Sequence, residues 1–405
     1  MQDQDCVIAG AGPAGMMAGL LLARAGCRVT VIEKHPDFLH DFRGDTIHPS
    51  TLQLMADLGW LDEFLTLPHQ KAPDLHAEIA GRQVTIADFR RLKTECRYIA
   101  FMPQWDFLNF LAAKAAAFPG FTLLMGHSVT GLLREGGRVS GLSWQSGAES
   151  GEIRAPLVIG ADGRHSVIRR EAGFTVTDFG SPVDVVWLRL SRRQDDPAPA
   201  MSHAGPGQGL VLIDRGDYWQ CGYVIRKGSF EDLKAAGLPA FRTSLAALAP
   251  IPAARFDEIT AWEQIHLLSI RMDRLTRWWA PGVLCIGDAA HAMSPVGGFG
   301  VNLAIQDAVA AANILAAPLR EGRLSPRDLA RVEARRLFPT RATQGLQKMM
   351  RRKRKPDGQA AKRPPGFIRL IARWPVLSRL MGRLIGIGFR PERVAPLKRG
   401  LADER

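Results

Sequence analysis

The chain has 405 residues, of which 46% are hydrophobic and 23% are charged, a composition typical of a globular enzyme large enough for two domains. Its five scattered cysteines lack C-x-x-C spacing, which argues against a disulfide framework or a zinc site. Residues 344–405 contain 17 Lys and Arg against 4 Asp and Glu, whereas the preceding residues contain 36 of each kind, so the positive charge says nothing about the catalytic part and nucleic-acid binding is not expected.

The first predicted unit is a βαβ fold at residues 5–33. A short apolar strand, residues 6–9, leads into Gly10, Gly12 and Gly15 at the G-x-G-x-x-G spacing, and an Ala- and Leu-rich helix and a second strand follow. These glycines permit a tight turn, close approach of a pyrophosphate and close helix packing. Glu33 ends the second strand, where a carboxylate accepts both hydroxyls of an unphosphorylated ribose, which indicates FAD or NAD rather than NADP.

The next segment alternates between the predicted parallel sheet and excursions from it. Arg43 lies in a loop after Glu33, either as a cofactor contact or as a solvated side chain. Residues 76–80 and 83–89 form a hairpin around Gly81, and Pro103 begins a helix over residues 104–117. Strands at 122–125, 131–134 and 139–144 form an antiparallel flap, and residues 157–159 return to the parallel sheet.

Two more strand ends carry polar turns. Gly160-Ala-Asp162-Gly163 follows a buried strand, a geometry that suits a phosphate or sugar and equally a structural turn. Residues 175–275 read as a mostly antiparallel sheet interrupted by helices at 230–235 and 239–248. Residues 283–286 form another buried strand, then come Gly287-Asp288, a glycine-rich loop and a helix over 301–316. A flavin accounts for all three strand ends, whereas NAD accounts only for the first.

These motifs, in this order, resemble the p-hydroxybenzoate-hydroxylase type (class A) of FAD-dependent aromatic monooxygenases, over about residues 5–340. The resemblance implies an α/β fold: a Rossmann-like FAD-binding domain of the GR2 type, interleaved with a mostly antiparallel β-sheet substrate domain, plus a basic helical C-terminal tail. We assign residues 1–72, 98–174 and 276–343 to the FAD-binding domain, 73–97 and 175–275 to the substrate domain, and 344–405 to the basic amphipathic segment.

The resemblance also implies a set of residues that bind FAD tightly but non-covalently. Arg43 and Gln104 would touch FAD, Val129 would pack by the adenine, Asp162 would support the pyrophosphate region and NAD(P)H use, and Asp288 would hold the ribityl chain. Backbone N–H groups of Val301 and Asn302 would face the pyrimidine edge of the flavin. The full set is Gly10, Gly12, Pro13, Ala14, Gly15, Glu33, Lys34, Arg43, Gln104, Val129, Asp162, Asp288, Pro295, Gly300, Val301 and Asn302.

The implied reaction is monooxygenation with NADH or NADPH and O2, through a flavin C4a-hydroperoxide, of a small or polycyclic aromatic or quinone-like substrate. Phe299 stands where many relatives have Gln or Lys, which leaves substrate polarity open, and the W-x-W-x-I-P segment of flavin-dependent halogenases is absent from the sequence. No catalytic base is singled out among the candidates His48, His203, Tyr218, Tyr223 and His266, and His291 is expected to be structural.

Two alternative functions stay open: an FAD-dependent reductase of prenyl-type double bonds, and a non-catalytic membrane-associated binding protein with the flavin fold. Residues 367–387 predict one or two basic amphipathic helices divided at Pro375, packed on the body or in peripheral contact with anionic lipid. No apolar run is expected to span a bilayer, and the first strand leaves no room for a signal peptide. We therefore expect a cytoplasmic monomer or homodimer without metal.

Overall fold

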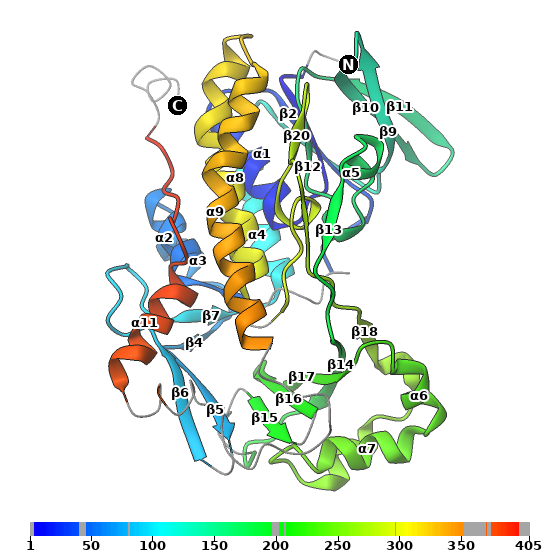
Figure 1. Cartoon of the computed structure of the whole chain (residues 1–405), viewed down its shortest axis with the longest axis vertical. Helices are drawn as coiled ribbons and strands as arrows, with labels where there is room; N and C mark the ends of the chain where they lie inside the picture. Colours follow the sequence, from blue (N-terminus) through cyan, green and yellow to red (C-terminus); the bar gives the residue numbers. More distant parts are fainter. Residues whose placement is uncertain are drawn as a thin grey trace.

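Figure 1 shows the computed structural model of the chain. It describes residues 4–39, 46–79, 82–196, 202–205, 208–295, 297–351, 370 and 374–396. Two large sheets lie at opposite ends of the long axis, and the long helices α8 (Phe299–Arg320) and α9 (Pro326–Arg351) run along it (Figure 1).

The first sheet has six strands in the order β20-β21-β12-β1-β2-β8. β1 (Cys6–Ala9) pairs in parallel with β12 (Val158–Gly160) and with β2 (Val29–Glu33), and β8 (Phe121–Met125) extends the sheet beyond β2. β21 (Val283–Cys285) lies in parallel beyond β12, and β20 (Trp279–Ala280) closes the edge antiparallel to it. Helix α1 (Pro13–Arg24) packs against α8 and against α4 (Gln104–Ala116), so the expected α/β core is confirmed.

An antiparallel flap is present, as the sequence predicts. Residues 122–125, which were expected in this flap, instead belong to β8 of the parallel sheet, where they pair with β2. It comprises β9 (Ser128–Glu135), β10 (Arg138–Ser146) and β11 (Glu149–Arg154) in the order β11-β10-β9, and Gly136 and Gly137 make the hairpin turn with positive φ. The sequence analysis did not predict β11. Its residues are mostly polar and exposed, so they lack the apolar alternation by which a strand is recognised.

The second sheet has seven strands in the order β18-β14-β17-β16-β15-β5-β6. The strands are β18 (His266–Leu268), β14 (Val183–Ser191), β17 (Tyr218–Arg226), β16 (Gln208–Asp214), β15 (Ser202–Gly205), β5 (Asp74–Ile79) and β6 (Arg82–Asp88). All neighbours are antiparallel except β15 and β5. Two segments far apart in the sequence thus share one sheet. The division of the chain into domains stays a prediction.

The two faces of this sheet have different neighbours. On one face Val186, Leu188 and Tyr223 pack under α7 (Leu238–Ala246) and the 3-10 helix η2 (Ala253–Glu258), with α6 (Phe230–Ala235) beside them. On the other face Trp187 and Val211 join an apolar cluster that includes residues of the FAD-binding part. The second face is therefore the one turned toward the first sheet.

Short elements connect the two sheets. A three-stranded sheet contains β3 (Thr46–Ile47), β7 (Ile99–Phe101) and β4 (Gln70–Ala72), and a two-stranded ladder contains β13 (Val176–Asp178) and β19 (Asp273–Leu275). The remaining short helices are α2 (Pro49–Asp57), α3 (Leu61–Phe64), α5 (Val167–Glu171), η1 (Gly163–His165), η3 (Trp262–Gln264) and η4 (Gly287–Ala289).

Helix α8 is long and apolar enough, by length and composition, to cross a bilayer, so the expectation that no apolar run reaches that length was wrong. Within the fold, 72% of its apolar window is buried, and it packs against α1 and α9. This burial is the usual situation of a core helix, whose apolar surface contacts other parts of the protein all round.

The C-terminal helix α11 (Pro375–Gly386) begins at Pro375, where the sequence places the break, and packs against β6 (Figure 1). Its small residues make this contact close. A Cβ on Gly382 would lie 2.0 Å from the Asp88 carbonyl oxygen, and one on Gly386 would lie 3.0–3.1 Å from Leu92, Phe89 and Pro49. We call Ser378, Gly382 and Gly386 the small-residue face of α11.

Candidate functional site

The turn after β1 has the geometry that the glycine spacing predicts. Gly10 has φ 94° and leaves no room for a side chain, since a Cβ would lie 2.5 Å from the Ala161 carbonyl oxygen. A Cβ on Gly15 would lie 1.8 Å from the Gly10 carbonyl oxygen. At Gly12, by contrast, no protein atom lies within 4 Å of the Cβ position, and Gly12 caps α1 with Pro13 at its first position. The N-terminus of α1 therefore faces open space, as an anion-binding turn requires.

Glu33 ties this turn to the second strand. One carboxylate oxygen accepts the Ala11 N–H at 2.9 Å and the other accepts the His35 N–H at 3.0 Å. Its side chain is therefore held at the end of β2 beside the glycine turn, whereas the neighbouring Lys34 is exposed. The expected contact of Glu33 with a ribose stays a prediction, and the carboxylate has lone pairs left to make it.

Asp162 lies beside the glycine turn, with its carboxylate directed into its own loop. The carboxylate accepts hydrogen bonds from Ser166 Oγ at 2.5 Å and from the backbone N–H of Val167 at 2.7 Å and of Ile168 at 3.2 Å. Burial raises the pKa of this carboxyl, although these donors act in the opposite direction. The side chain therefore caps α5, which the sequence did not reveal, and the predicted support of a pyrophosphate stays a prediction.

Asp288 lies at the carboxyl end of β21, within η4. Its carboxylate is 3.4 Å from the Arg164 guanidinium, which comes from the turn after β12. The carboxylate is partly exposed at 31%, so it is open to a further partner. A Cβ on the preceding Gly287 would be 3.1 Å from Ala14 of α1. The ends of β1, β12 and β21 therefore meet at one edge of the parallel sheet.

Asn302 joins the start of α8 to the β3–α2 connection. Its Oδ1 accepts the His48 N–H at 2.9 Å and the Thr51 hydroxyl at 2.7 Å, and its Nδ2 donates to the Thr46 carbonyl at 3.0 Å. The sequence predicts a role only for the backbone of Asn302. Gly300 and Val301 lie in the first turn of α8, where N–H groups have no partner within the helix and the dipole is positive, whereas Pro295 is exposed before it.

His48 is buried at 1% exposure at the same junction. Its Nδ1 lies 2.8 Å from the Ile385 carbonyl of α11, which can only accept, so Nδ1 carries the proton. The other nitrogen, Nε2, has no hydrogen-bond partner within the described residues. Burial lowers the pKa of His48 to about 4, although the Ile385 bond opposes this. The imidazole is therefore neutral near pH 7 and presents an unused acceptor.

The other candidate bases lie elsewhere. Tyr223 is buried on the far face of the seven-stranded sheet against Phe241. Tyr218 stacks under Arg189 at the start of β17, and His266 is exposed on the edge strand β18. His203 is in β15, but its side chain lies outside the described residues. Among candidates with described side chains, His48 is thus the one at the start of α8.

His291 is part of a buried ionic network, as its expected structural role requires. Its Nε2 donates to Asp307 at 2.5 Å, and Asp307 also accepts from Arg336 at 2.8 Å. Arg336 in turn lies 3.2 Å from Glu392, near the C-terminal end of the described chain. Burial alone would raise the pKa of Asp307, but the charges and hydrogen bonds of His291 and Arg336 lower it on balance.

An apolar cluster fills the junction between the start of α8, the seven-stranded sheet and α11. We call it the junction cluster; its buried members are Ala87, Phe89, Leu92, Ile99, Phe101, Ile213, Phe299 and Ile385, with Trp187 and Val211 packed against them. The Nε1 of Trp187 is buried and has no hydrogen-bond partner among the described residues. The sequence analysis missed Trp187, because a tryptophan in an apolar strand has no local signal of function.

The remaining predicted site residues have mixed placements. Gln104 is buried as the first residue of α4, and Val129 in β9 packs on the main core. Arg43 lies outside the described residues. All five cysteines are buried and free, and within the described part of the chain no group of three or more His, Cys, Asp or Glu is placed to hold a metal ion.

Comparisons with known proteins agree with this geometry. The family model described as "FAD binding domain" matches residues 3–345. The 6-methylpretetramide 4-monooxygenase of Streptomyces rimosus is 33% identical over 389 residues, covering 94% of this chain and 91% of the relative. The chain belongs to the FAD-binding-domain family of FAD-dependent aromatic monooxygenases. The resemblance to FAD-dependent aromatic monooxygenases, which the three motifs indicated, is therefore confirmed. A monooxygenase is supported over the alternative functions.

Two further matches widen the comparison. A rifampicin monooxygenase of Streptomyces venezuelae is 29% identical over 318 residues, and the match covers 75% of this chain but 62% of that longer protein. The crystal structure of p-nitrophenol 4-monooxygenase from Pseudomonas putida has the same fold, with a TM-score of 0.79 at 20% identity over 97% of this chain and 99% of that one.

The residues present fit FAD, the cofactor of this monooxygenase. The open space at Gly12 admits a pyrophosphate at the start of α1, and α8 contacts both α1 and η4, the short helix that contains Asp288. When bound, FAD supplies the redox and oxygen chemistry. The chain itself must bind and orient the substrate and exclude water, which the junction cluster suits.

Proposed function

We propose that this FAD-dependent monooxygenase hydroxylates a polycyclic aromatic or quinone-like substrate, using NADH or NADPH and O2. The observation that supports it most is the junction cluster. Trp187, which packs against it, has a buried Nε1, and His48, whose ring lies 6.3 Å from that of Phe299, has a buried Nε2; neither atom has a hydrogen-bond partner among the described residues. The name of the 33% identical relative, a 6-methylpretetramide monooxygenase, points to the same class of substrate.

In this proposal the two polar atoms recognise the substrate. Trp187 Nε1 donates to a substrate carbonyl, and His48 Nε2 accepts from a substrate hydroxyl. Because burial holds the pKa of His48 at about 4, the imidazole binds a hydroxyl without taking its proton at neutral pH. His48 thus positions the ring rather than acting as a base.

The predicted cofactor set is kept as a proposal. We infer that the turn residues Gly10 to Gly15, Glu33, Asp288 and the start of α8 contact FAD, with Lys34, Arg43, Gln104, Val129, Asp162 and Pro295 as further candidates. We also propose a cytoplasmic monomer or homodimer. Peripheral membrane contact of the C-terminal segment is a separate proposal, argued below from the surface of α11.

The test is an aerobic screen of the purified holoenzyme with phenols, quinone precursors and polycyclic aromatics. We expect polycyclic phenols to accelerate NAD(P)H oxidation and to gain one oxygen atom by mass spectrometry. Failure of the protein to bind FAD, or NAD(P)H oxidation that yields only hydrogen peroxide with every compound, would overturn the proposal.

A matched pair of variants tests the recognition itself. Trp187→Phe keeps an aromatic ring but removes the donor, so the KM for the substrate should rise about tenfold. Trp278→Phe is the control, because its Nε1 is also buried without a partner in the described structure, but in the main core beside His291. Equal effects of the two substitutions on KM would argue against a role of Trp187 in binding.

A further inference from the structure

Helix α11 has two faces of opposite character. Its small-residue face contacts β6, whereas Val376 and Leu380 on the other face are 66% and 50% exposed. Trp374, directly before the helix, is 56% exposed. Of the nine large hydrophobic side chains that are exposed among the described residues, four lie between residues 370 and 380. Single exposed apolar side chains are ordinary, but a cluster of them on one segment marks a binding surface.

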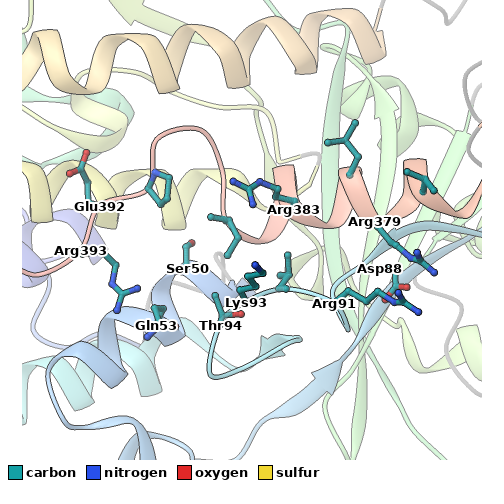
Figure 2. Close-up of a pocket in the computed structure, with 15 residues that line it drawn as sticks. Ser50, Gln53, Asp88, Arg91, Lys93, Thr94, Arg379, Arg383, Glu392 and Arg393 are labelled. Carbon is teal, nitrogen blue, oxygen red and sulfur yellow. The ribbon is translucent and has the colours of Figure 1, made fainter.

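Basic side chains line a groove beside the exposed apolar side chains of α11. A groove of about 510 Å³ lies between α11 and the loop after β6, and Figure 2 shows the cations that line it: Arg91, Lys93, Arg379, Arg383 and Arg393. The acids in the groove already have partners, since Asp88 lies 3.6 Å from Arg90 and Glu392 lies 2.7 Å from Arg335.

Four of these five cations have no ion-pair partner among the described residues. Arg393 is paired with Asp57, but Arg91, Lys93, Arg379 and Arg383 form no ion pair with any described residue. Arg91, Lys93 and Arg383 are also exposed. We define the α11 surface as the four cations without an ion-pair partner among the described residues, together with three exposed apolar side chains. Its members are Arg91, Lys93, Arg379, Arg383, Trp374, Val376 and Leu380. It combines a net positive charge with exposed aliphatic and indole side chains.

We propose that the α11 surface docks on an anionic lipid bilayer. A basic amphipathic helix binds in the interface by burying its apolar side chains at the boundary of headgroups and acyl chains while its cations contact lipid phosphates. Free phosphate or nucleic acid would account for the four cations but would leave Val376 and Leu380 in water. An anionic bilayer satisfies both, and the excess of 17 basic over 4 acidic residues in 344–405 adds long-range attraction.

Docking there would place the substrate junction at the membrane. Ile385 of the same helix belongs to the junction cluster, and its carbonyl holds His48. A lipophilic substrate dissolved in the bilayer would then be close to its binding site. This last step rests on the proposed function, whereas the docking itself does not.

Vesicle co-sedimentation of the full-length holoenzyme tests the docking. We expect binding to vesicles of phosphatidylcholine with phosphatidylglycerol, weakening at high salt, and no binding to phosphatidylcholine alone. The Leu380→Glu variant should bind these vesicles at least about tenfold more weakly. The reason is that a carboxylate would replace an apolar side chain that the bilayer buries on docking. Its control is Leu267→Glu, since Leu267 is 41% exposed on β18 and lies outside this surface.

A second variant separates apolar insertion from headgroup binding. Trp374 fluorescence, taken as the difference from Trp374→Phe, should shift to the blue on anionic vesicles. Binding by Leu380→Glu that equals the wild type would mean contact through phosphates alone and would overturn the proposal. The proposal would also be overturned if the wild-type protein stayed in the supernatant with anionic vesicles. In that case an acidic protein would be the remaining candidate partner for the α11 surface. NAD(P)H oxidation and melting temperature of Leu380→Glu without vesicles should equal those of the wild type, which separates this test from that of the proposed function.

Discussion

Two regions of this monooxygenase use glycine for close approach, with different results. In the turn after β1, Gly10 and Gly15 bring backbone against backbone, and Gly12 between them faces open space. In α11, Gly382 brings a helix to the Asp88 carbonyl of β6, and protein fills the contact. The first arrangement leaves room for a ligand, whereas the second makes a packing interface. The role of a closely packed glycine therefore depends on whether protein or open space lies beside it.

The largest expected effect separates the glycines of the turn. Gly15→Val should prevent folding, because even its Cβ would lie 1.8 Å from the Gly10 carbonyl oxygen. Gly12→Ala should fold, since no protein atom lies within 4 Å of the added Cβ. It should bind FAD at least about tenfold more weakly, because the methyl group would collide with the pyrophosphate. Circular dichroism and flavin absorbance measure the two outcomes. A Gly12→Ala protein with full flavin content would refute the assignment of this space to FAD.

A second test concerns His48, which links α11 to the start of α8 through its bonds with Ile385 and Asn302. Its pKa of about 4 in the fold lies below the usual 6.5, so the folded state binds fewer protons than the unfolded state. The contribution of neutral His48 to the free energy of unfolding should be fully present above pH 6.5. It should fall by about 3 kcal/mol as the pH is lowered to 4. His48→Gln should remove this part of the pH dependence in urea unfolding.

The control for that profile is His266→Gln, because His266 is exposed on β18. It should leave the pH dependence of unfolding as in the wild type. An unchanged profile in His48→Gln would show that protons taken up elsewhere cause the loss of stability in acid.

The smallest expected effect concerns the packing glycine. Gly382→Ala should lower the free energy of unfolding by about 1–3 kcal/mol, because the added methyl overlaps the Asp88 carbonyl. Gly345→Ala, in helix α9 with nothing within 4 Å, should instead raise it by about 0.5–1 kcal/mol. Urea titrations of the two variants should therefore move in opposite directions. Equal shifts would mean that α11 yields easily and that its contact with β6 is loose.

The contrast also explains what the sequence could predict. The G-x-G-x-x-G turn, the presence of strands β1, β2, β12 and β21 and the start of α4 follow from local patterns, because a pyrophosphate and a helix end constrain residues close together in the chain. The order of the strands in the sheet was not predicted. The pairing of His48 with Ile385 spans 337 positions, and nothing local indicates it. Trp187 likewise gains its interest only from the sheet face on which it lies.

The place of α11 in the chain also bears on folding during translation. Ile385 leaves the ribosome long after the glycine turn and after every strand of the parallel sheet. A nascent chain can therefore assemble its parallel sheet before its junction cluster has a wall on the α11 side and before His48 has its acceptor. Under the proposed function, the apolar enclosure for the substrate is complete only once α11 has been made.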